Sequence, residues 1–181
     1  MVLRLKRATE EDLEFLVRLD LDGEGYTPGD EGPRDLARHR AKIGRFVRDP
    51  DKAAWVYGQA ATGRQVAGIL CSFRALATES PSAGGWAFYH SIRRFLPDDG
   101  RFCEVFNLWV EPGFRRQGLA TRLKEQLEVE SRRRGVAMIY THTEASNPHV
   151  IELNRKLGYR QIRRGPIWDA VERVSLVKDL A

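Results

Sequence analysis

The sequence predicts an α/β (α+β) fold, in which a mixed sheet carries helices on its faces. Short runs with alternating or continuous apolar character, typical of strands, recur along the chain. Longer runs with helical apolar spacing stand between several of them, and Gly and Pro mark the boundaries. The predicted order is β-α-α-β-β-β-α-β-α-β-β. No linker or repeat interrupts it, so the 181 residues, 1–181, are expected to form one domain.

The N-terminal quarter predicts a strand and two helices. Residues 2–8 alternate apolar and basic side chains, which is typical of a strand. Thr9 precedes three acidic residues and an apolar face, so it is expected to cap a helix. Residues 20–32 are rich in Gly, Asp and Pro and predict a loop. Pro33 suits the first turn of a second helix that runs to about Arg48.

The middle of the chain predicts a hairpin, a long connection and a central strand. Residues 53–60 and 64–76 flank Ala-Thr-Gly and predict the hairpin. Residues 77–100 are longer than most connections and are interpreted as an insertion with a short helix near 88–95. It could form a binding loop or could only pack against the domain. Residues 101–110 are apolar on both faces, as expected of a buried strand.

The C-terminal part alternates helices and strands. A helix is predicted over 119–134 and ends at Gly135, and a strand follows at 136–143. Asn147 and Pro148 then predict the cap and first position of another helix. The last two strands are predicted at residues 159–164 and 172–180.

The composition excludes several classes of protein. Hydrophobic residues make up 42% and charged residues 30%, and no apolar run approaches the roughly 20 residues that cross a bilayer, so no membrane partner is expected. The N-terminus lacks the apolar core of a secretory signal, so the expected location is cytoplasmic. The net charge of +5 would attract nucleic acid and a phosphorylated cofactor alike, but most basic residues are spread along the chain, so no nucleic-acid partner is expected. Cys71 and Cys103 lie in apolar runs and are expected to be buried thiols, and no Cys/His spacing predicts a metal site.

The segment VEPGFRRQGLAT (110–121) stands where the central strand passes into a helix. A helix N-terminus carries unpaired N–H groups and partial positive charge, so it binds phosphate well. Gly118 allows close approach of a ligand to the backbone, and Arg115 and Arg116 add positive charge. The segment therefore predicts a pyrophosphate site. The alternative is a strand-to-helix turn with charged side chains.

Two common phosphate ligands do not fit this segment. Gly113 and Gly118 have the spacing of a P-loop, but Leu119 and Ala120 stand where its Lys and Ser or Thr belong. A GxGxxG fingerprint is absent, and the segment lies far from the first strand. ATP and NAD are therefore disfavoured, and a ligand held by backbone amides without a metal remains.

RRQGLA (115–120) matches the Arg/Gln-x-x-Gly-x-Gly/Ala signature of the GNAT superfamily of N-acetyltransferases, which the chain resembles. LWVEPGF before it is similar to that family's strand and bulge leading into the pyrophosphate loop. Asn147-Pro148 and LNRKLGYR (153–160) resemble the second motif, Asn…Tyr-x-Lys-x-Gly-Phe. The element order agrees over nearly the whole chain. The resemblance implies a largely antiparallel GNAT-like sheet of about seven strands, flanked by four or so helices, with splayed central strands.

The resemblance also implies an acyl-CoA cofactor, commonly acetyl-CoA. Its pyrophosphate would lie on the amides of the loop, and its pantetheine arm would pair like an added strand with the end of the central strand. Asn147 resembles the family asparagine near this arm, although it could equally be a simple helix cap. The implied cofactor-binding residues are Leu108, Trp109, Val110, Arg115, Arg116, Gln117, Gly118, Leu119, Ala120, Thr121, Asn147 and Asn154.

Direct acyl transfer to an amine requires a base, because an ammonium group cannot attack a carbonyl. Several family members keep a glutamate base at the position of Glu104, six residues before Val110. The alternative for Glu104 is a salt-bridged or edge glutamate. The N–H of Val110 would polarise the thioester carbonyl.

Asn154 departs from the family pattern. The family often has a tyrosine there, which protonates the leaving thiolate. An asparagine can hydrogen-bond the sulfur but cannot act as an acid, so the usual general acid is in doubt. Tyr140 or Tyr159 could take the role, although Tyr159 fits better as a core residue. His142 could face the slot or serve the structure alone.

The acceptor is the least determined part of the prediction. A small-molecule primary amine is expected first, with a protein N-terminus or lysine as the alternative acceptor and a non-catalytic acyl-CoA sensor as the alternative function. The segment 20–32 holds five acids that could attract a cationic amine or could only be solvated: Asp20, Asp22, Glu24, Asp30 and Glu31. Trp86, Phe88 and Tyr89 could line an apolar pocket or only pack. A homodimer through sheet edges or through residues 172–180 could form.

Overall fold

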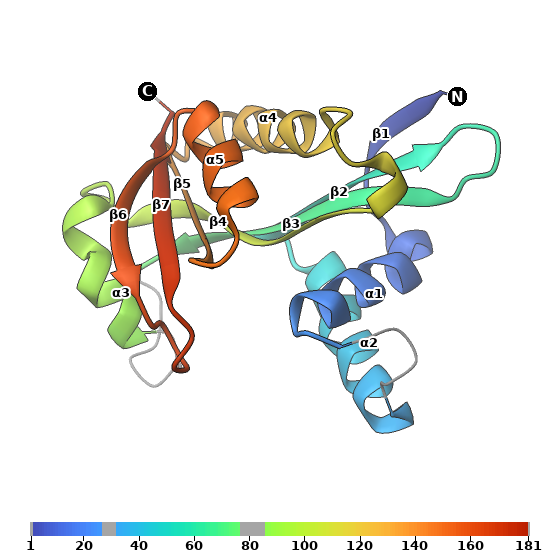
Figure 1. Ribbon diagram of the computed structural model, residues 1–181, viewed down its shortest axis with the longest axis horizontal. Helices are drawn as coiled ribbons and strands as arrows, with labels where there is room; N and C mark the ends of the chain where they lie inside the picture. Colours follow the sequence, from blue (N-terminus) through green and yellow to red (C-terminus); the bar gives the residue numbers. More distant parts are fainter. Residues whose placement is uncertain (1, 27–31, 77–85, 181) are drawn as a thin grey trace. The chain divides into compact units, whose positions relative to one another are not determined.

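The computed structural model describes residues 2–26, 32–76 and 86–180, apart from the side chains of residues 33, 86 and 87. Seven strands form one mixed sheet in the order β1-β2-β3-β4-β5-β7-β6 (Figure 1). The strands are β1 (Leu3–Arg7), β2 (Lys52–Gln59), β3 (Gln65–Ala75), β4 (Arg101–Val110), β5 (Met138–Glu144), β6 (Arg160–Gly165) and β7 (Arg173–Asp179). The helices are α1 (Leu13–Gly23), α2 (Pro33–Arg48), α3 (Trp86–Ile92), α4 (Leu119–Arg133) and α5 (Pro148–Lys156).

These elements confirm the predicted fold class. β1–β2, β2–β3, β5–β7 and β6–β7 pair in antiparallel fashion, and β4–β5 pair in parallel. The β4–β5 register consists of two pairs, Cys103 with Ile139 and Glu104 with Tyr140. β4 continues to Val110, so its pairing with β5 ends well before the strand does, as expected of splayed central strands. Short 3₁₀ turns add Glu10–Asp12, Arg93–Phe95 and Pro112–Phe114.

The chain divides into two compact units. The first comprises Met1–Ser72 and Phe106–Lys124, and the second comprises Phe73–Val105 and Glu125–Ala181. The single domain over residues 1–181 stays a prediction. Among the described residues, every helix is too short or too polar to cross a bilayer.

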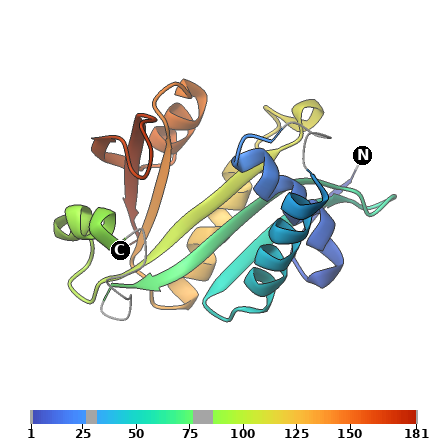
Figure 2. The same ribbon diagram turned by 90° about the horizontal axis from the view of Figure 1, so that it is seen from below.

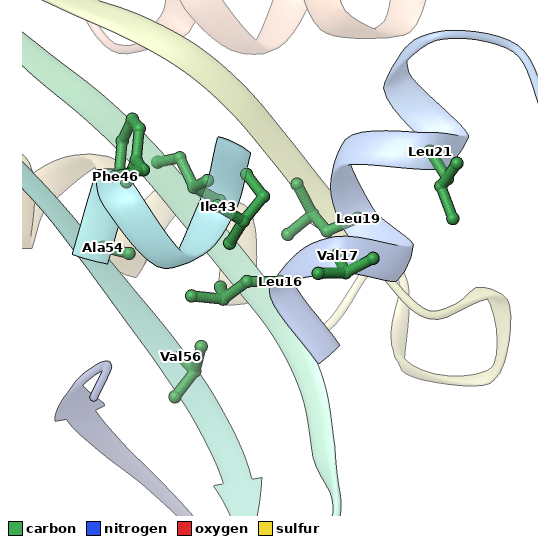
Figure 3. Close-up of a cluster of buried hydrophobic side chains, with 9 residues drawn as sticks. Leu16, Val17, Leu19, Leu21, Ile43, Phe46, Ala54 and Val56 are labelled. Carbon is green, nitrogen blue, oxygen red and sulfur yellow. The ribbon is translucent and has the colours of Figure 1, made fainter. Parts of the chain in front are cut away.

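The first unit is organised by a layer of apolar side chains between its two N-terminal helices and its strands. α1 and α2 lie side by side on the same face of β2 and β3 (Figures 1 and 2). Figure 3 shows how α1, α2 and β2 contribute to the cluster, which consists of Leu16, Val17, Leu19, Leu21, Ile43, Phe46, Ala54, Val56 and Leu70. Burying each larger side chain contributes about 1.5–3 kcal/mol, so this cluster fixes α1 against the sheet.

The predicted loop over residues 20–32 begins too early, because α1 continues to Gly23. Asp20 lies in its last turn and is 2% exposed. Its Oδ2 is 2.5 Å from Nδ1 of His39, and its Oδ1 accepts a hydrogen bond from Lys42 Nζ at 2.8 Å. These partners on α2 satisfy a carboxylate that would otherwise be costly to bury. Asp20 therefore joins the two helices and does not form part of an acidic rim.

Removing this carboxylate should strongly destabilise the chain. Asp20→Ala removes the buried carboxylate that His39 and Lys42 share and leaves them only the exposed Glu24, so we expect a loss of about 3 kcal/mol in the free energy of unfolding. Asp22→Ala, two residues away on the exposed surface, is the control and should change it by less than about 0.5 kcal/mol. Urea denaturation of the two variants checks this, and equal midpoints would contradict it.

The second unit contains a separate aromatic and aliphatic core. Its buried members include Tyr89 and Ile92 of α3, Phe102 of β4, Tyr140 of β5 and Val177 of β7. The half of α4 in this unit is held to β7, because Lys178 Nζ donates to Glu128 Oε1 at 2.5 Å. α3 lies within the predicted insertion, so part of that insertion packs into this core.

β7 has strand partners on both sides, β5 and β6. A second copy of the chain therefore cannot pair as an added strand beside β7, and the predicted dimer through residues 172–180 stays a prediction. The edge strands of the sheet are β1 and β6. Both are rich in arginine and lysine, which disfavours strand-to-strand association. The sheet edges therefore do not indicate which surface a homodimer would use.

Candidate active site

The predicted pyrophosphate loop connects β4 to α4 in the first unit. After the 3₁₀ turn at Pro112–Phe114, the backbone takes positive φ at Arg116 (61°) and at Gly118 (79°). Left-handed geometry costs a non-glycine residue about 1–2 kcal/mol, so Arg116 is held there by the rest of the loop. Such strain gathers at functional sites, and alternating backbone hands form concave arrays of N–H groups that bind anions.

The donors of the loop fit a diphosphate. The N–H of Arg122 is bonded to the carbonyl of Gly118 at 3.0 Å, which is the first hydrogen bond of the helix. The N–H groups of the three preceding residues, 119–121, therefore come before any carbonyl of α4 that they could reach. A Cβ built on Gly118 meets no protein atom within 4 Å, so the backbone there is open to a ligand. Arg115, Arg116 and Gln117 are exposed around it.

The end of β4 has two different edges. The N–H of Glu111 donates to the carbonyl of Val66 on β3 at 2.9 Å. Because the backbone groups of successive residues alternate in a strand, those of Val110 and Leu108 point to the other edge. Arg115 Nε donates to the carbonyl of Val110 at 3.0 Å, in agreement with this. We therefore expect Leu108 and Val110 to offer backbone groups to the pantetheine arm, whereas Trp109 packs its ring on Phe15 at 6.0 Å.

β4 departs from strict alternation just before this segment. Phe106 packs against Phe46 of α2, with ring centroids 5.8 Å apart, and the next residue, Asn107, donates from Nδ2 to the carbonyl of Leu19 on α1 at 2.8 Å. Two consecutive residues of β4 thus contact the two helices of the first unit. A Cβ on Gly23 would lie 2.2 Å from Asn107 Nδ2, so a larger residue there would displace the Asn107 side chain from this contact.

Glu104 lies in the second unit and is 6% exposed. Its Oε2 is 2.5 Å from Nε of Arg74 on β3, and its Oε1 accepts a hydrogen bond from the Tyr89 hydroxyl at 2.6 Å. Glu104 is therefore the salt-bridged glutamate that the sequence left as an alternative, and both carboxylate oxygens have a partner. Its role as the general base stays a prediction.

His142 lies two residues beyond Tyr140, the β5 residue paired with Glu104. Its ring is 6.0 Å from that of Tyr140 and 5.0 Å from that of Trp168. Its Nδ1 is buried and has no hydrogen-bond partner among the described residues. Burial lowers the pKa of His142 from 6.5, the nearby Glu104 opposes this and Arg173 adds to it. A neutral imidazole accepts a proton at whichever ring nitrogen carries none.

The two asparagines of the second motif have local partners. Asn147 Oδ1 accepts from the N–H of Val150 at 3.3 Å, so the predicted helix cap is present. Asn154 is fully buried, and its Nδ2 donates to the carbonyl of Val150 at 2.9 Å. Its Oδ1 is buried without a partner among the described residues. Asn154 therefore offers an acceptor, for example to a pantetheine N–H. Because an amide NH2 carries two donors, the bond to Val150 leaves one N–H of Nδ2 for the predicted hydrogen bond to sulfur.

The tyrosines suggested as substitute acids are both buried. The Tyr140 hydroxyl is 3.2 Å from Oγ of Ser175, and burial raises the pKa of Tyr140 above its ordinary value. Burial likewise raises the pKa of Tyr159, whose ring lies under the Lys178 ammonium at 5.9 Å. Tyr159 is thus the core aromatic that was expected. A Tyr with a raised pKa is a weak acid, so neither is favoured as proton donor.

A cavity of about 350 Å³ opens between α1 and the ends of β3 and β4 in the first unit. Phe15, Tyr26 and Trp109 form aromatic walls, and Asp22, Arg18 and Glu111 supply charges. Among the described acids of residues 20–32, Asp22 alone lines this cavity; Glu24 pairs with Lys42 at 2.8 Å, and Asp30 and Glu31 lie outside the described residues. The Trp86 side chain also lies outside the described residues.

The structure thus gathers the predicted residues into two groups. Residues 108–110 and 115–121 lie together in the first unit, and Glu104, Asn147 and Asn154 belong to the second. Sequence reasoning missed Arg74 and missed the contact of Tyr89 with Glu104. The signal for both was Glu104 itself, because a charge in an apolar strand must find a partner on a neighbouring element.

Comparisons with known proteins agree with this geometry. Residues 16–159 match the family described as "Acetyltransferase (GNAT) family". Over 62 residues the chain is 42% identical to the ribosomal protein bS18-alanine N-acetyltransferase of Escherichia coli (strain K12), a match that covers 33% of the chain and 42% of that protein. The chain therefore spans less than half the length of the curated relatives that it matches.

Two solved structures share the fold over almost their whole length. Arabidopsis thaliana NAA60 in complex with acetyl-CoA superposes with a TM-score of 0.70 at 15% identity, covering 98% of each chain. The ribosomal-protein-S18-alanine N-acetyltransferase from Escherichia coli superposes with a TM-score of 0.65 at 15% identity, covering 99% of this chain and 95% of that one.

Proposed function

The chain belongs to the acetyltransferase (GNAT) family, and from this premise we propose that it moves the acetyl group of acetyl-CoA directly to a primary amine. The observation that carries the proposal is the loop between β4 and α4. It combines positive φ at Arg116 and Gly118, amide donors at residues 119–121 and two exposed arginines. This donor set fits a diphosphate held without a metal.

The residues of the chain would hold and orient the cofactor. The loop amides and Arg116 would bind the diphosphate, and the outer edge of β4 at Leu108 and Val110 would bind the amides of the pantetheine arm. Asn154 in the second unit has a buried acceptor Oδ1 without a partner among the described residues, which supports its predicted role as a cofactor-binding residue. When bound, acetyl-CoA supplies a thioester, whose C–S bond breaks as the new N–C bond forms. The N–H of Val110 polarises the carbonyl.

The chain must also remove a proton from the acceptor. One proton leaves the ammonium before attack and passes to a base, and the second N–H proton lost on forming the amide neutralises the CoA thiolate, directly or through water. We propose His142 Nδ1 as the first acceptor, because it is buried without a partner and its pKa is lowered, so it is neutral near pH 7. Glu104, the base predicted from the sequence, is the competing candidate.

The acceptor that suits this base is the α-amino group of a protein N-terminus. Such a group has a pKa of about 7.7–8.0, against about 10.4 for lysine. A base whose pKa lies below 6.5 therefore takes a proton from an α-ammonium at a cost lower by roughly 3 kcal/mol. The name of the Escherichia coli relative, an alanine N-acetyltransferase of ribosomal protein bS18, supports the same choice.

A small-molecule amine is the second candidate, as the sequence suggested. The observation in its favour is the cavity beside Trp109, whose volume of about 350 Å³ and aromatic walls suit a compact ligand. Asp22 at its wall could attract a cationic group.

A thiol-release assay with acetyl-CoA separates these acceptors. We expect turnover with a short peptide that begins with alanine, and kcat/KM at least tenfold lower for the same peptide with a blocked N-terminus and an internal lysine. A panel of small amines at equal concentration tests the second candidate. Faster turnover with a small amine than with the free N-terminus would contradict the preferred acceptor. No thiol release with any acceptor would contradict transfer itself.

A further inference from the structure

Arg74, Tyr89 and Glu104 form a closed cluster in the second unit, brought together from β3, α3 and β4. Besides its contacts to Glu104, the Arg74 guanidinium lies over the Tyr89 ring, 5.2 Å from the centroid. Each of the three side chains thus touches the other two. An ionised carboxylate with a cation on one oxygen and a hydroxyl donor on the other has a single favourable orientation.

The Tyr89 hydroxyl is held in place by its ring. The ring packs on Phe102 at 5.6 Å, on Tyr140 at 6.4 Å and on Phe88 at 5.4 Å. Tyr89 is only 8% exposed. Burial, with the neighbouring Glu104 second, raises the pKa of Tyr89, so the hydroxyl keeps its proton at any pH at which the chain works. It therefore acts as a permanent donor and not as an acid.

The hydrogen bond from Tyr89 to Glu104 links the insertion to a candidate catalytic residue. Tyr89 lies on α3, inside residues 77–100, and the sequence left open whether this segment binds or only packs. Tyr89 reaches the carboxylate that the sequence singled out for catalysis, from 15 residues away. The same β4 carboxylate lies beside the β5 residue Tyr140 and influences the pKa of His142.

We propose that Tyr89 is a positioning residue, through which the insertion fixes the Glu104 carboxylate for acyl transfer. The inference rests on the proposed function. Tyr89 holds Oε1 and Arg74 holds Oε2, so the carboxylate is fixed in one orientation. Without the hydroxyl the carboxylate keeps only Arg74 and can turn away from this orientation.

Tyr89→Phe removes the donor and keeps the ring. We expect kcat to fall about tenfold, since the Glu104 carboxylate loses one of its two side-chain partners and with it a fixed orientation. The KM for acetyl-CoA should not change. In a Glu104→Ala background the same substitution should have no further effect on kcat, because the acceptor of the Tyr89 hydroxyl is already gone. Tyr57→Phe, at a buried tyrosine of β2, is the matched control and should keep wild-type kcat.

The outcomes separate this inference from the proposed function. If the wild-type chain transfers acetyl groups and Tyr89→Phe keeps full kcat, or lowers kcat equally in both backgrounds, then Tyr89 has no positioning role. If the wild-type chain releases no thiol with any acceptor, the proposed function fails, and a catalytic role for Tyr89 fails with it. Thermal unfolding of each variant shows that the chain remains folded during the comparison.

Discussion

Gly118→Val should abolish measurable binding of coenzyme A, with an expected loss of at least 100-fold in affinity. Gly118 has φ of 79°, which a β-branched residue adopts only with strain. The space that its Cβ would enter contains no protein atom within 4 Å, so it is open for the diphosphate. Two effects therefore add, because the loop loses its shape and the added methyl groups fill the site.

Gly113→Val is the matched control for this experiment. Gly113 lies five residues earlier, its Cβ would also meet nothing within 4 Å, and its φ is not positive. Affinity within about threefold of wild type is expected. Isothermal titration with coenzyme A measures both variants, and thermal unfolding shows that they are folded. If Gly118→Val bound coenzyme A as tightly as Gly113→Val, the diphosphate would not lie on this loop.

The parts of the site that the sequence predicted are those defined by local geometry. The role of a glycine between a strand and a helix can be predicted from the neighbouring residues alone. Gly118 has the positive φ that favours glycine at such a position. Asn147 caps α5 through the N–H of Val150, only three residues away. α2, predicted from Pro33 to about Arg48, was found with those bounds. In each case the decisive interaction lies within a few residues of the chain.

The parts that were missed depend on partners distant in sequence. α1 extends through Asp20 because His39 and Lys42, 19 and 22 residues later, neutralise that carboxylate. Composition alone predicted a loop there, since Asp and Gly favour turns. Glu104 likewise obtains its partners Arg74 and Tyr89 from 30 and 15 residues away. Periodicity shows that such a charge is buried, but it does not show what compensates it.

The same limit applies to His142. From the sequence it was one histidine on a strand, for which a structural role was the simpler interpretation. Its significance comes from an unpartnered Nδ1 and from burial between the rings of Tyr140 and Trp168. Neither can be read from spacing, because Trp168 belongs to the connection between β6 and β7, 26 positions later. The candidate base is thus identified by a missing hydrogen-bond partner at Nδ1, which only three-dimensional contacts reveal.

His142→Gln should lower kcat by about 100-fold or more while the affinity for coenzyme A stays within about threefold of wild type, because a general base contributes about 10²–10⁴-fold. His149→Gln, at an exposed histidine of α5, is the control and should keep wild-type turnover. Glu104→Gln should also lower turnover, since Arg74 and Tyr89 then lose their anionic partner.

The pH dependence decides which of the two residues is the base. Burial lowers the pKa of His142, so its neutral form predominates above pH 6.5 and is lost only as the pH falls below that value. If His142 is the base, kcat/KM of the wild type has an acid limb below pH 6.5 in addition to the ionisation of the amine. This limb should disappear in His142→Gln and persist, at lower amplitude, in Glu104→Gln. The reverse pattern would assign the base to Glu104, and an unchanged limb in both variants would exclude both residues.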